Sequence, residues 1–299
     1  MILQEHFKLY NGVHIPKLGL GTWMINNKNV VQAVQDALQL GYRHIDTAQA
    51  YRNQVGIAHA IQRSSIARDE IFITHKLAAG IKSYKKAVQA IDQSLHKMQL
   101  DHLDLMLIHS PQPWTKFGTA ERYFEGNLEV WQALIDAYYA GKLRAIGVSN
   151  FQQNDLKNLI DNSALTPMVN QVLAHIGNTP FELIEYCQTH QILVEAYAPI
   201  AHGQLLKHDL VNAMAEKYAV SVPQLSIRYA LQLGLLPLPK TTHPTRMQHN
   251  AEVDFQIAEA DLNSLKHIEK IQDYGRDSFM PVFGGKLSFT ALLSALFHR

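Results

Sequence analysis

The sequence has very little cysteine, no long apolar run and almost no net charge. Cys187 is the single cysteine, so neither an intrachain disulfide nor a CxxC site can form. The chain has no run of about 18 apolar residues, which argues against a transmembrane helix, and its start, MILQEHFKLY, lacks a signal-peptide core. Its 27 basic and 26 acidic residues give a net charge of +1, which offers no general attraction to nucleic acid or anionic membranes. We therefore expect a cytoplasmic protein without a nucleic-acid or membrane partner.

Metal-binding motifs and linkers are also missing. None of the 16 histidines stands in an HExxH or similar ligand spacing, so we expect no metal site. No tract rich in proline, glycine or serine divides the chain. Its 299 residues, 47% of them apolar, can bury a large core without disulfides or a metal. We expect a single domain over residues 1–299, with 284–299 as a C-terminal tail.

The first structural signal is a β-hairpin, followed by eight short apolar runs. Asn11 and Gly12 form a turn signal between two alternating runs within residues 7–16. Helical stretches separate the later runs, and several of those runs have the continuous apolar character of strands in parallel sheets. The predicted strands are Leu18–Gly21, Tyr42–Asp46, Ile71–Thr74, Leu103–His109, Leu143–Val148, Met168–Gln171, Leu193–Tyr197 and Leu235–Leu238.

Eight strand–helix units in about 240 residues indicate a (β/α)8 TIM barrel with an N-terminal hairpin. The main alternative is a doubly wound sheet with the dinucleotide fingerprint GxGxxG. The nearest candidate, Gly19–Met24, lacks the third glycine of that fingerprint. Among the helix ends, Asn127 is predicted to cap a helix that runs to Gly141, and Gly41 and Gly234 are predicted to end two others.

Reactive side chains stand at the predicted strand ends, which in a TIM barrel meet at one mouth. Asp46, Lys76 and His109 close three successive strands, and Tyr51 lies in the loop after Asp46. A phenol has a pKa of about 10, which a nearby ammonium lowers. A carboxylate keeps the ammonium charged, and an imidazole can bind a carbonyl oxygen. The set suits proton transfer to a carbonyl group.

The remaining strand ends carry groups suited to binding. Ser149 and Asn150 follow the fifth strand, while Gln171, Tyr197 and Lys240 mark the last three. Each residue alone has an ordinary explanation as a loop or packing residue. Their joint occurrence at one mouth favours a binding site.

Six segments of the chain form distinctive motifs. They are GYRHIDTA at 41–48 with Tyr51 and Asn53, FITHKL at 72–77, LDHLDLMLIH at 100–109, IGVSNF at 146–151, VNQ at 169–171, and LPKTTHPTR at 238–246 with Asn250. These segments resemble the signatures of the aldo-keto reductase family, and the resemblance runs from Gly12 to about Phe283. Within that family the chain is similar to bacterial 2,5-diketo-gluconate and glyoxal reductase-like members. The resemblance implies a TIM barrel that reduces carbonyl groups with a nicotinamide cofactor.

The resemblance also implies roles for individual residues. Asp46, Tyr51, Lys76 and His109 would be a catalytic tetrad, with Tyr51 as the general acid in reduction. The implied cofactor is NADPH, which becomes NADP+, with its carboxamide, nicotinamide ring, 2′-phosphate and adenine held by successive parts of the mouth. The residues implied to bind it are Thr22, Asp46, Ser149, Asn150, Gln171, Tyr197, Lys240, Thr241, Arg246 and Asn250.

The predicted substrate pocket departs from the family pattern. We expect Trp23, Ala78, Ser110 and Trp114 to line it. Ala78 and Ser110 are small where large aromatic residues are common in the family, and the loop after Tyr51 is short. Because fewer aromatic faces weaken the binding of flat apolar molecules, we expect small or polar carbonyl substrates, such as dicarbonyls, keto acids or sugar-derived aldehydes and ketones.

The sequence thus predicts NADPH-dependent reduction of aldehydes or ketones by a monomer or weak homo-oligomer. The alternative is a catalytically weak barrel that binds the cofactor as a sensor. Schiff-base chemistry at Lys76 is disfavoured, because Asp46 would keep that amine charged. The apolar spacing within Lys286–Arg299 fits a segment docked on the barrel or an oligomer contact, and alternatively a lid over the mouth.

Overall fold

The computed structural model describes residues 1–285, without the side chain of Arg276. After η1 (Ile2–Gln4), β1 (His6–Lys8) and β2 (His14–Pro16) pair as an antiparallel hairpin. The connecting loop is closed by a 2.8 Å hydrogen bond from the Leu9 amide to the Val13 carbonyl, and Gly12 adopts the left-handed φ of +88°. The predicted hairpin is confirmed.

Eight further strands form one parallel sheet in chain order, from β3 to β10. Backbone hydrogen bonds from Gly19 to Pro237 and from Gly21 to Pro239, at 3.3 and 3.0 Å, join the two edges into a barrel. The predicted (β/α)8 barrel is therefore confirmed. Its strands are β3 (Leu20–Gly21), β4 (His44–Asp46), β5 (Phe72–Leu77), β6 (Leu103–Ile108), β7 (Leu143–Ser149), β8 (Val169–Leu173), β9 (Leu193–Tyr197) and β10 (Leu236–Leu238).

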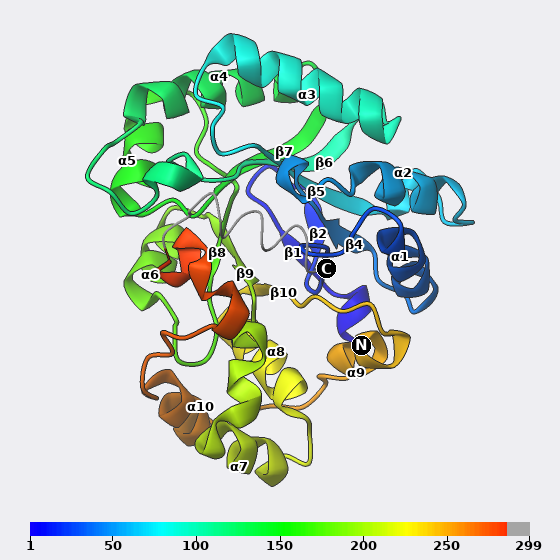
Figure 1. The fold of residues 1–299 in the computed structure, drawn as a ribbon, viewed down its shortest axis with the longest axis vertical. Helices are drawn as coiled ribbons and strands as arrows, with labels where there is room; N and C mark the ends of the chain where they lie inside the picture. Colours follow the sequence, from blue (N-terminus) through cyan, green and yellow to red (C-terminus); the bar gives the residue numbers. More distant parts are fainter. Residues whose placement is uncertain (286–299) are drawn as a thin grey trace.

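The helices surround the strands, with α3, α4 and α5 along one side and α7, α8 and α10 along the opposite side (Figure 1). They bury apolar stripes against the sheet, which is why amphipathic segments alternate with apolar ones in the sequence. Their bounds are α1 (Asn29–Gln39), α2 (Gln54–Gln62), α3 (Tyr84–Met98), α4 (Phe124–Tyr139), α5 (Gln153–Asn162), α6 (Phe181–Thr189), α7 (Asp209–Lys217), α8 (Val222–Gln232), α9 (Pro244–Ala251) and α10 (Glu259–Lys266).

Short 3-10 turns shape the loops between these elements. Three of them, η2, η4 and η5, follow strands at the mouth of the barrel. Within residues 1–285, none of the helices combines the length and the apolar character that crossing a bilayer requires. The predicted tail, residues 284–299, falls almost entirely outside the described residues.

Besides η1, the 3-10 turns are η2 (Gln49–Tyr51), η3 (Arg68–Glu70), η4 (Trp114–Lys116), η5 (Ala201–Lys207), η6 (Gly275–Phe279) and η7 (Pro281–Phe283).

Two predicted helix ends are confirmed and one predicted cap is wrong. Gly41 and Gly234 follow the last turns of α1 and α8 with φ of +98° and +75°, as glycine C-caps require. Asn127 instead lies inside α4, which begins at Phe124. Its side chain donates to the Pro111 carbonyl at 3.0 Å and accepts from the Lys82 ammonium at 2.7 Å. It therefore holds a loop at the mouth and does not cap the helix.

Candidate active site

A buried lysine–carboxylate pair lies at the centre of the site. Asp46 is the last residue of β4 and pairs in register with Thr74 of β5. Lys76 lies two residues after Thr74 on the same strand, so the side chains of Asp46 and Lys76 both point into the barrel. The Lys76 ammonium is fully buried and donates to both Asp46 carboxylate oxygens at 2.7 and 2.6 Å, and to the Thr47 carbonyl at 3.0 Å. Because an unpaired buried charge is strongly unfavourable, each member of the pair depends on the other.

The phenol of Tyr51 lies beside this pair. Its oxygen is 3.3 Å from the Lys76 ammonium, which also lies 4.9 Å from the ring centroid. The turn that carries Tyr51 is anchored by Gln49, whose amide oxygen accepts from the Ala78 amide at 2.8 Å and whose amide nitrogen donates to Ser94 at 3.1 Å. This short, anchored turn explains how a loop residue reaches the strand-end groups.

Burial raises the pKa of the Tyr51 phenol well above its usual value, and the Asp46 carboxylate adds to the shift. This direction is opposite to the one expected from the Lys76 ammonium alone. The loss of hydration disfavours the phenolate more than the ammonium favours it. Tyr51 therefore keeps its proton over the neutral pH range.

His109, which follows β6, completes the tetrad. Its ring lies edge-on to Tyr51, with centroids 5.8 Å apart, and to Trp114, with centroids 5.2 Å apart. Burial, together with the positive charge of Lys76, lowers the pKa of His109 well below its ordinary value. The imidazole is therefore neutral, and its buried Nδ1 atom has no hydrogen-bond partner. The structure thus brings together all four residues of the predicted tetrad.

A cavity of about 650 Å³ opens at the mouth of the barrel beside the tetrad. Ser149, Asn150, Gln171 and Tyr197 line one part of it, next to Asp46. The Asn150 amide nitrogen donates to the His109 carbonyl and to the Ser149 hydroxyl, both at 3.0 Å, and its oxygen accepts from Tyr197 at 2.7 Å. These bonds arrange hydroxyl and amide groups, and one aromatic ring, within reach of a single flat ligand.

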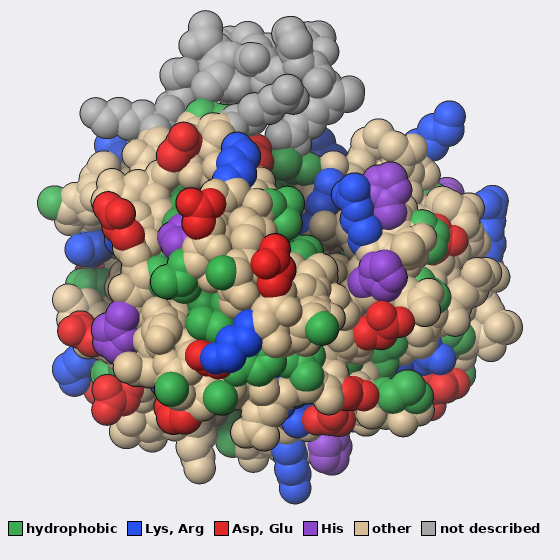
Figure 2. Space-filling model, turned by 90° about the horizontal axis from the view of Figure 1, so that it is seen from below, with side chains coloured by type: hydrophobic (Ala, Val, Ile, Leu, Met, Phe, Trp, Pro, Cys, Tyr) green, Lys and Arg blue, Asp and Glu red, His purple; other side chains and the backbone are tan. Residues whose placement is uncertain are grey.

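The cavity continues to β10 and the first turn of α9. Thr241 and Asn250 are buried there, and Lys240 and Arg246 are exposed. Figure 2 shows basic and histidine side chains gathered beside a hollow on the side of the molecule where α9 lies. Two cations at a helix N-terminus match the charge of a phosphate group.

The predicted pocket residues divide into two groups. Trp23 and Trp114 line the cavity, whereas Ala78 and Ser110 are not among its lining residues. Thr22, a residue predicted to bind the cofactor, does not line the cavity either. Ser110 is fully buried, and its hydroxyl accepts from the backbone N–H of Gln112 at 3.3 Å. The Thr22 hydroxyl donates to the Asp46 carbonyl at 2.7 Å, so it supports the strand end from behind.

Sequence reasoning missed three residues near the site. His202 and Asp277 come from distant parts of the chain and line the cavity, with 2.8 Å between the His202 Nδ1 atom and an Asp277 carboxylate oxygen, a contact for which the sequence holds no signal. Glu195 lies inside the barrel, where its carboxylate accepts from the Gln171 amide at 2.6 Å. It stands two residues before Tyr197 in a strand, and this shared face could have identified it.

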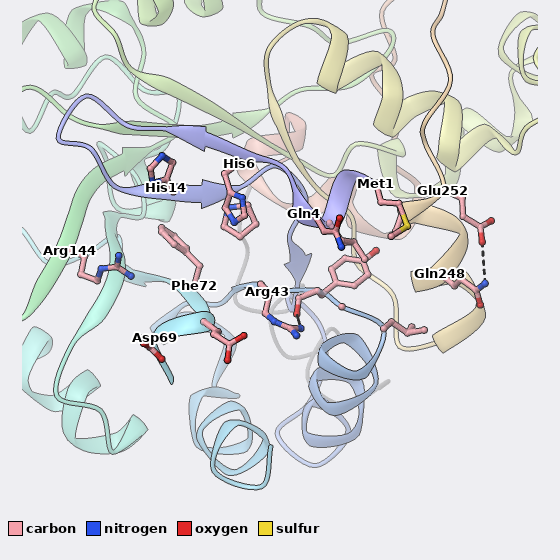
Figure 3. Close-up of a pocket in the computed structure, with 17 residues that line it drawn as sticks. Met1, Gln4, His6, His14, Arg43, Asp69, Phe72, Arg144, Gln248 and Glu252 are labelled. Carbon is pink, nitrogen blue, oxygen red and sulfur yellow. Dashed lines mark hydrogen bonds between the residues drawn. The ribbon is translucent and has the colours of Figure 1, made fainter. Parts of the chain in front are cut away.

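A second cavity, of about 800 Å³, lies at the opposite end of the barrel (Figure 3). The hairpin, the end of α1, the start of β5 and the end of α9 line it. His6, His14, Asp69, Arg144 and Glu252 at this cavity are all exposed. Within residues 1–285, no three His, Cys, Asp or Glu side chains come together as metal ligands.

Comparison with known proteins gives one consistent result. The model of the "Aldo/keto reductase family" matches residues 17–270. Glyoxal reductase of Bacillus subtilis (strain 168) is 38% identical over 275 residues, which cover 91% of this chain and 96% of that protein. Methylglyoxal reductase of Escherichia coli (strain K12) is 36% identical over 281 residues, covering 93% and 98%. A crystal structure of Bombyx mori aldo-keto reductase in complex with NADP is similar, with a TM-score of 0.81, 32% identity and coverage of 92% and 95%.

Proposed function

The chain belongs to the aldo/keto reductase family, and from this premise we propose that it reduces small aldehydes and ketones to alcohols with NADPH. Family membership makes it an oxidoreductase that acts on carbonyl groups. The observation that best supports the finer proposal is the Lys76 ammonium, which joins the Asp46 carboxylate to the Tyr51 phenol beside the mouth cavity. The proposal includes the expected cytoplasmic location and monomeric or weakly oligomeric state.

Tyr51 would donate the proton that the carbonyl oxygen gains. The raised pKa keeps the phenol protonated, as a general acid must be before the reaction. Once the proton has left, the phenolate lies 3.3 Å from the Lys76 ammonium, which stabilises the new negative charge. Asp46 holds that ammonium in place through its two short hydrogen bonds.

His109 would orient the carbonyl group. The neutral ring lines the cavity edge-on to Tyr51, so that both residues can direct an N–H or O–H group at one oxygen atom. A neutral imidazole suits this role, because a charged one would compete with Lys76 for the phenolate. Two donors at one oxygen fix the angle at which the carbonyl carbon faces the cofactor.

The residues along the cavity fit an extended dinucleotide. When bound, NADPH supplies a hydride to the carbonyl carbon. Ser149, Asn150 and Gln171 would hold the carboxamide, with Tyr197 against the flat ring. Lys240, Thr241 and Arg246 would hold the 2′-phosphate, and Asn250 the adenine. The internal bonds of Asn150 occupy its N–H groups, and its oxygen, which accepts from Tyr197 at 2.7 Å, keeps a second lone pair for the ligand.

We propose small dicarbonyls as the substrate class. The names of two relatives, glyoxal reductase and methylglyoxal reductase, support this choice. The small side chains of Ala78 and Ser110 no longer support it, because these residues do not line the cavity. Trp23 and Trp114 line the cavity, and Trp23 lies edge-on to the ring of His202, which contacts Asp277. This mixture of aromatic and polar groups suits a compact, polar carbonyl compound.

The test is consumption of NADPH with glyoxal, methylglyoxal, an aromatic aldehyde and a steroid ketone as substrates. We expect the highest kcat/KM with the small dicarbonyls, and the alcohol as the product. Each substrate is repeated with NADH to measure cofactor choice. Binding of NADPH without turnover of any carbonyl would support the sensor alternative and contradict the proposal.

A further inference from the structure

A second carboxyl group lies inside the barrel beneath the Asp46–Lys76 pair. Glu195 on β9 is fully buried, and one of its oxygens accepts from the Gln171 amide nitrogen at 2.6 Å. The same nitrogen donates to Asp46 at 2.9 Å. The other Glu195 oxygen has no hydrogen-bond partner, and the nearest histidine nitrogen, on His44, is 4.0 Å away. The proposed proton transfer does not use this group.

The two carboxyl groups determine which way the Gln171 amide points. An amide oxygen turned towards the Asp46 carboxylate would be repelled, whereas the NH2 group can donate one hydrogen to Asp46 and the other to an oxygen of Glu195, whether that carboxyl is protonated or ionised. Both N–H groups of Gln171 are therefore directed inward, to Asp46 and Glu195. Because Gln171 lines the mouth cavity, its amide oxygen is the polar atom left for a ligand.

We propose that Glu195 is a positioning residue, which holds Gln171 so that the amide oxygen is presented to the nicotinamide half of the cofactor. The carboxamide of that half carries an NH2 group, which matches an oxygen acceptor. This inference rests on the proposed function, because it requires the cofactor to lie along the mouth cavity.

The charges around Glu195 make cofactor binding depend on pH. Burial and the Asp46 carboxylate raise the pKa of Glu195, the Gln171 hydrogen bond and the Lys76 ammonium oppose the rise, and the net value is about 8. Burial and Lys76 lower the pKa of His44 to about 3 and that of His109 well below its ordinary value, so both rings are neutral. The neighbouring β10 contributes only leucine and proline. Above about pH 8, Glu195 therefore adds one uncompensated negative charge under the site.

That charge distinguishes the two redox forms of the cofactor. The nicotinamide ring is positively charged in NADP+ and neutral in NADPH. An ionised Glu195 attracts the first ring and has little effect on the second. The affinity for NADP+ relative to NADPH should therefore increase as the pH rises through about 8.

The experiment measures dissociation constants for NADPH, NADP+ and 2′-phospho-ADP-ribose, which lacks the nicotinamide, with the wild type, Glu195→Leu and Glu195→Gln. We expect Glu195→Leu to weaken both dinucleotides by about three- to tenfold, the scale of one hydrogen bond. Binding of 2′-phospho-ADP-ribose should stay within about twofold, which also shows that the variant is folded. Glu195→Gln should bind the dinucleotides almost as the wild type does, because its amide oxygen still accepts from Gln171.

The second readout is the ratio of the NADPH and NADP+ dissociation constants between about pH 6 and about pH 9.5, a range that spans the expected titration. This ratio should rise with pH in the wild type and stay flat in Glu195→Gln, which a purely structural role would not produce. Equal weakening of all three ligands in Glu195→Leu, or identical pH profiles for the wild type and Glu195→Gln, would overturn the inference alone. Failure of the wild type to bind NADPH would overturn the proposed function and this inference with it.

Discussion

The two ends of the barrel carry cavities of similar size, about 650 Å³ at the mouth and about 800 Å³ at the base, but their polar groups differ in burial. At the mouth, the ionisable groups Asp46, Lys76 and His109 are nearly or completely buried, and their pKa values or ion pairing reflect it. At the base, His14 and Asp69 are exposed to water. Cavity volume therefore does not distinguish the two ends, whereas dehydration of the charged groups at each cavity does, since the buried carboxylate near the base, Asp104, does not line the cavity there.

The topology explains the difference. The carboxyl ends of all eight strands meet at the mouth, so that residues far apart in the sequence converge there. At the base, the hairpin lies next to strand starts such as Phe72 (Figure 3). Charged residues at that end pair sideways, as Arg144 does with Asp104 at 2.6 Å. The comparison predicts large functional effects for changes at the mouth and none at the base.

The largest effect is expected for Tyr51→Phe. The change removes the acidic hydrogen and keeps the ring beside Lys76 and His109. We expect kcat for carbonyl reduction to fall by about 100-fold or more, the scale of a lost general acid. The dissociation constant of NADPH should barely change, and its measurement is the control. Turnover close to that of the wild type would show that another group donates the proton.

Arg246→Ala should give the next largest effect, on cofactor choice. The arginine at the start of α9 offers a fork of N–H donors to a phosphate that NADH lacks. Loss of one charge-assisted contact should weaken NADPH binding by about 10- to 100-fold and leave NADH binding nearly unchanged. Titration of both cofactors against both proteins measures the difference. Equal affinity of the wild type for NADPH and NADH would contradict this role for Arg246.

Lys82→Met tests a side chain that holds a loop at the mouth in place, and its effect should be smaller than that of Arg246→Ala. Lys82 donates to the Ser110 carbonyl at 2.8 Å and to Asn127 at 2.7 Å, and thereby holds the segment that follows His109. Without it, two acceptors lose their donor, and we expect kcat/KM to fall by about three- to tenfold. Lys85→Met, on the exposed face of α3, is the matched control and should behave as the wild type. An unchanged kcat/KM in Lys82→Met would show that the segment holds its position without the lysine.

The same variant should also change how the free energy of unfolding depends on pH. Burial lowers the pKa of Lys82 from 10.5 to about 7, so between these values the unfolded chain binds a proton that the folded chain does not. The free energy of unfolding of the wild type should therefore rise as the pH increases from about 7 towards 10, and be lowest below that window. In Lys82→Met this rise should be smaller. Denaturation at several pH values measures it, and parallel curves for the two proteins would contradict the assignment.

The sequence predicted the barrel well, because strand ends and helix signals are local. All eight predicted strands exist, and the tetrad converges because parallel strands share one end. Three features could not be predicted from the sequence. The pKa of Tyr51 depends on burial, the side chain of Asn127 bonds to Lys82 and a loop carbonyl and does not cap its helix, and Ser110 is buried outside the cavity lining. Each of these depends on packing between segments that are distant in the sequence, for which a single chain carries no periodic signal.

The smallest effects on Tm and kcat/KM are expected for substitutions at the base. The same two changes, histidine to alanine and aspartate to asparagine, can be made at both ends of the barrel. His14→Ala and Asp69→Asn change exposed side chains that line the base cavity, whereas His109→Ala and Asp46→Asn change their buried counterparts. Because water already solvates the exposed pair, its loss should alter Tm by no more than about 2 °C and leave kcat/KM unchanged. Asp46→Asn should remove most activity, since the Lys76 ammonium loses the carboxylate that balances its charge. Tm and kcat/KM measured for all four variants test the comparison directly. A fall in kcat/KM caused by either base variant would show that the two ends are coupled through the barrel, and that exposure alone does not separate the functional end from the other.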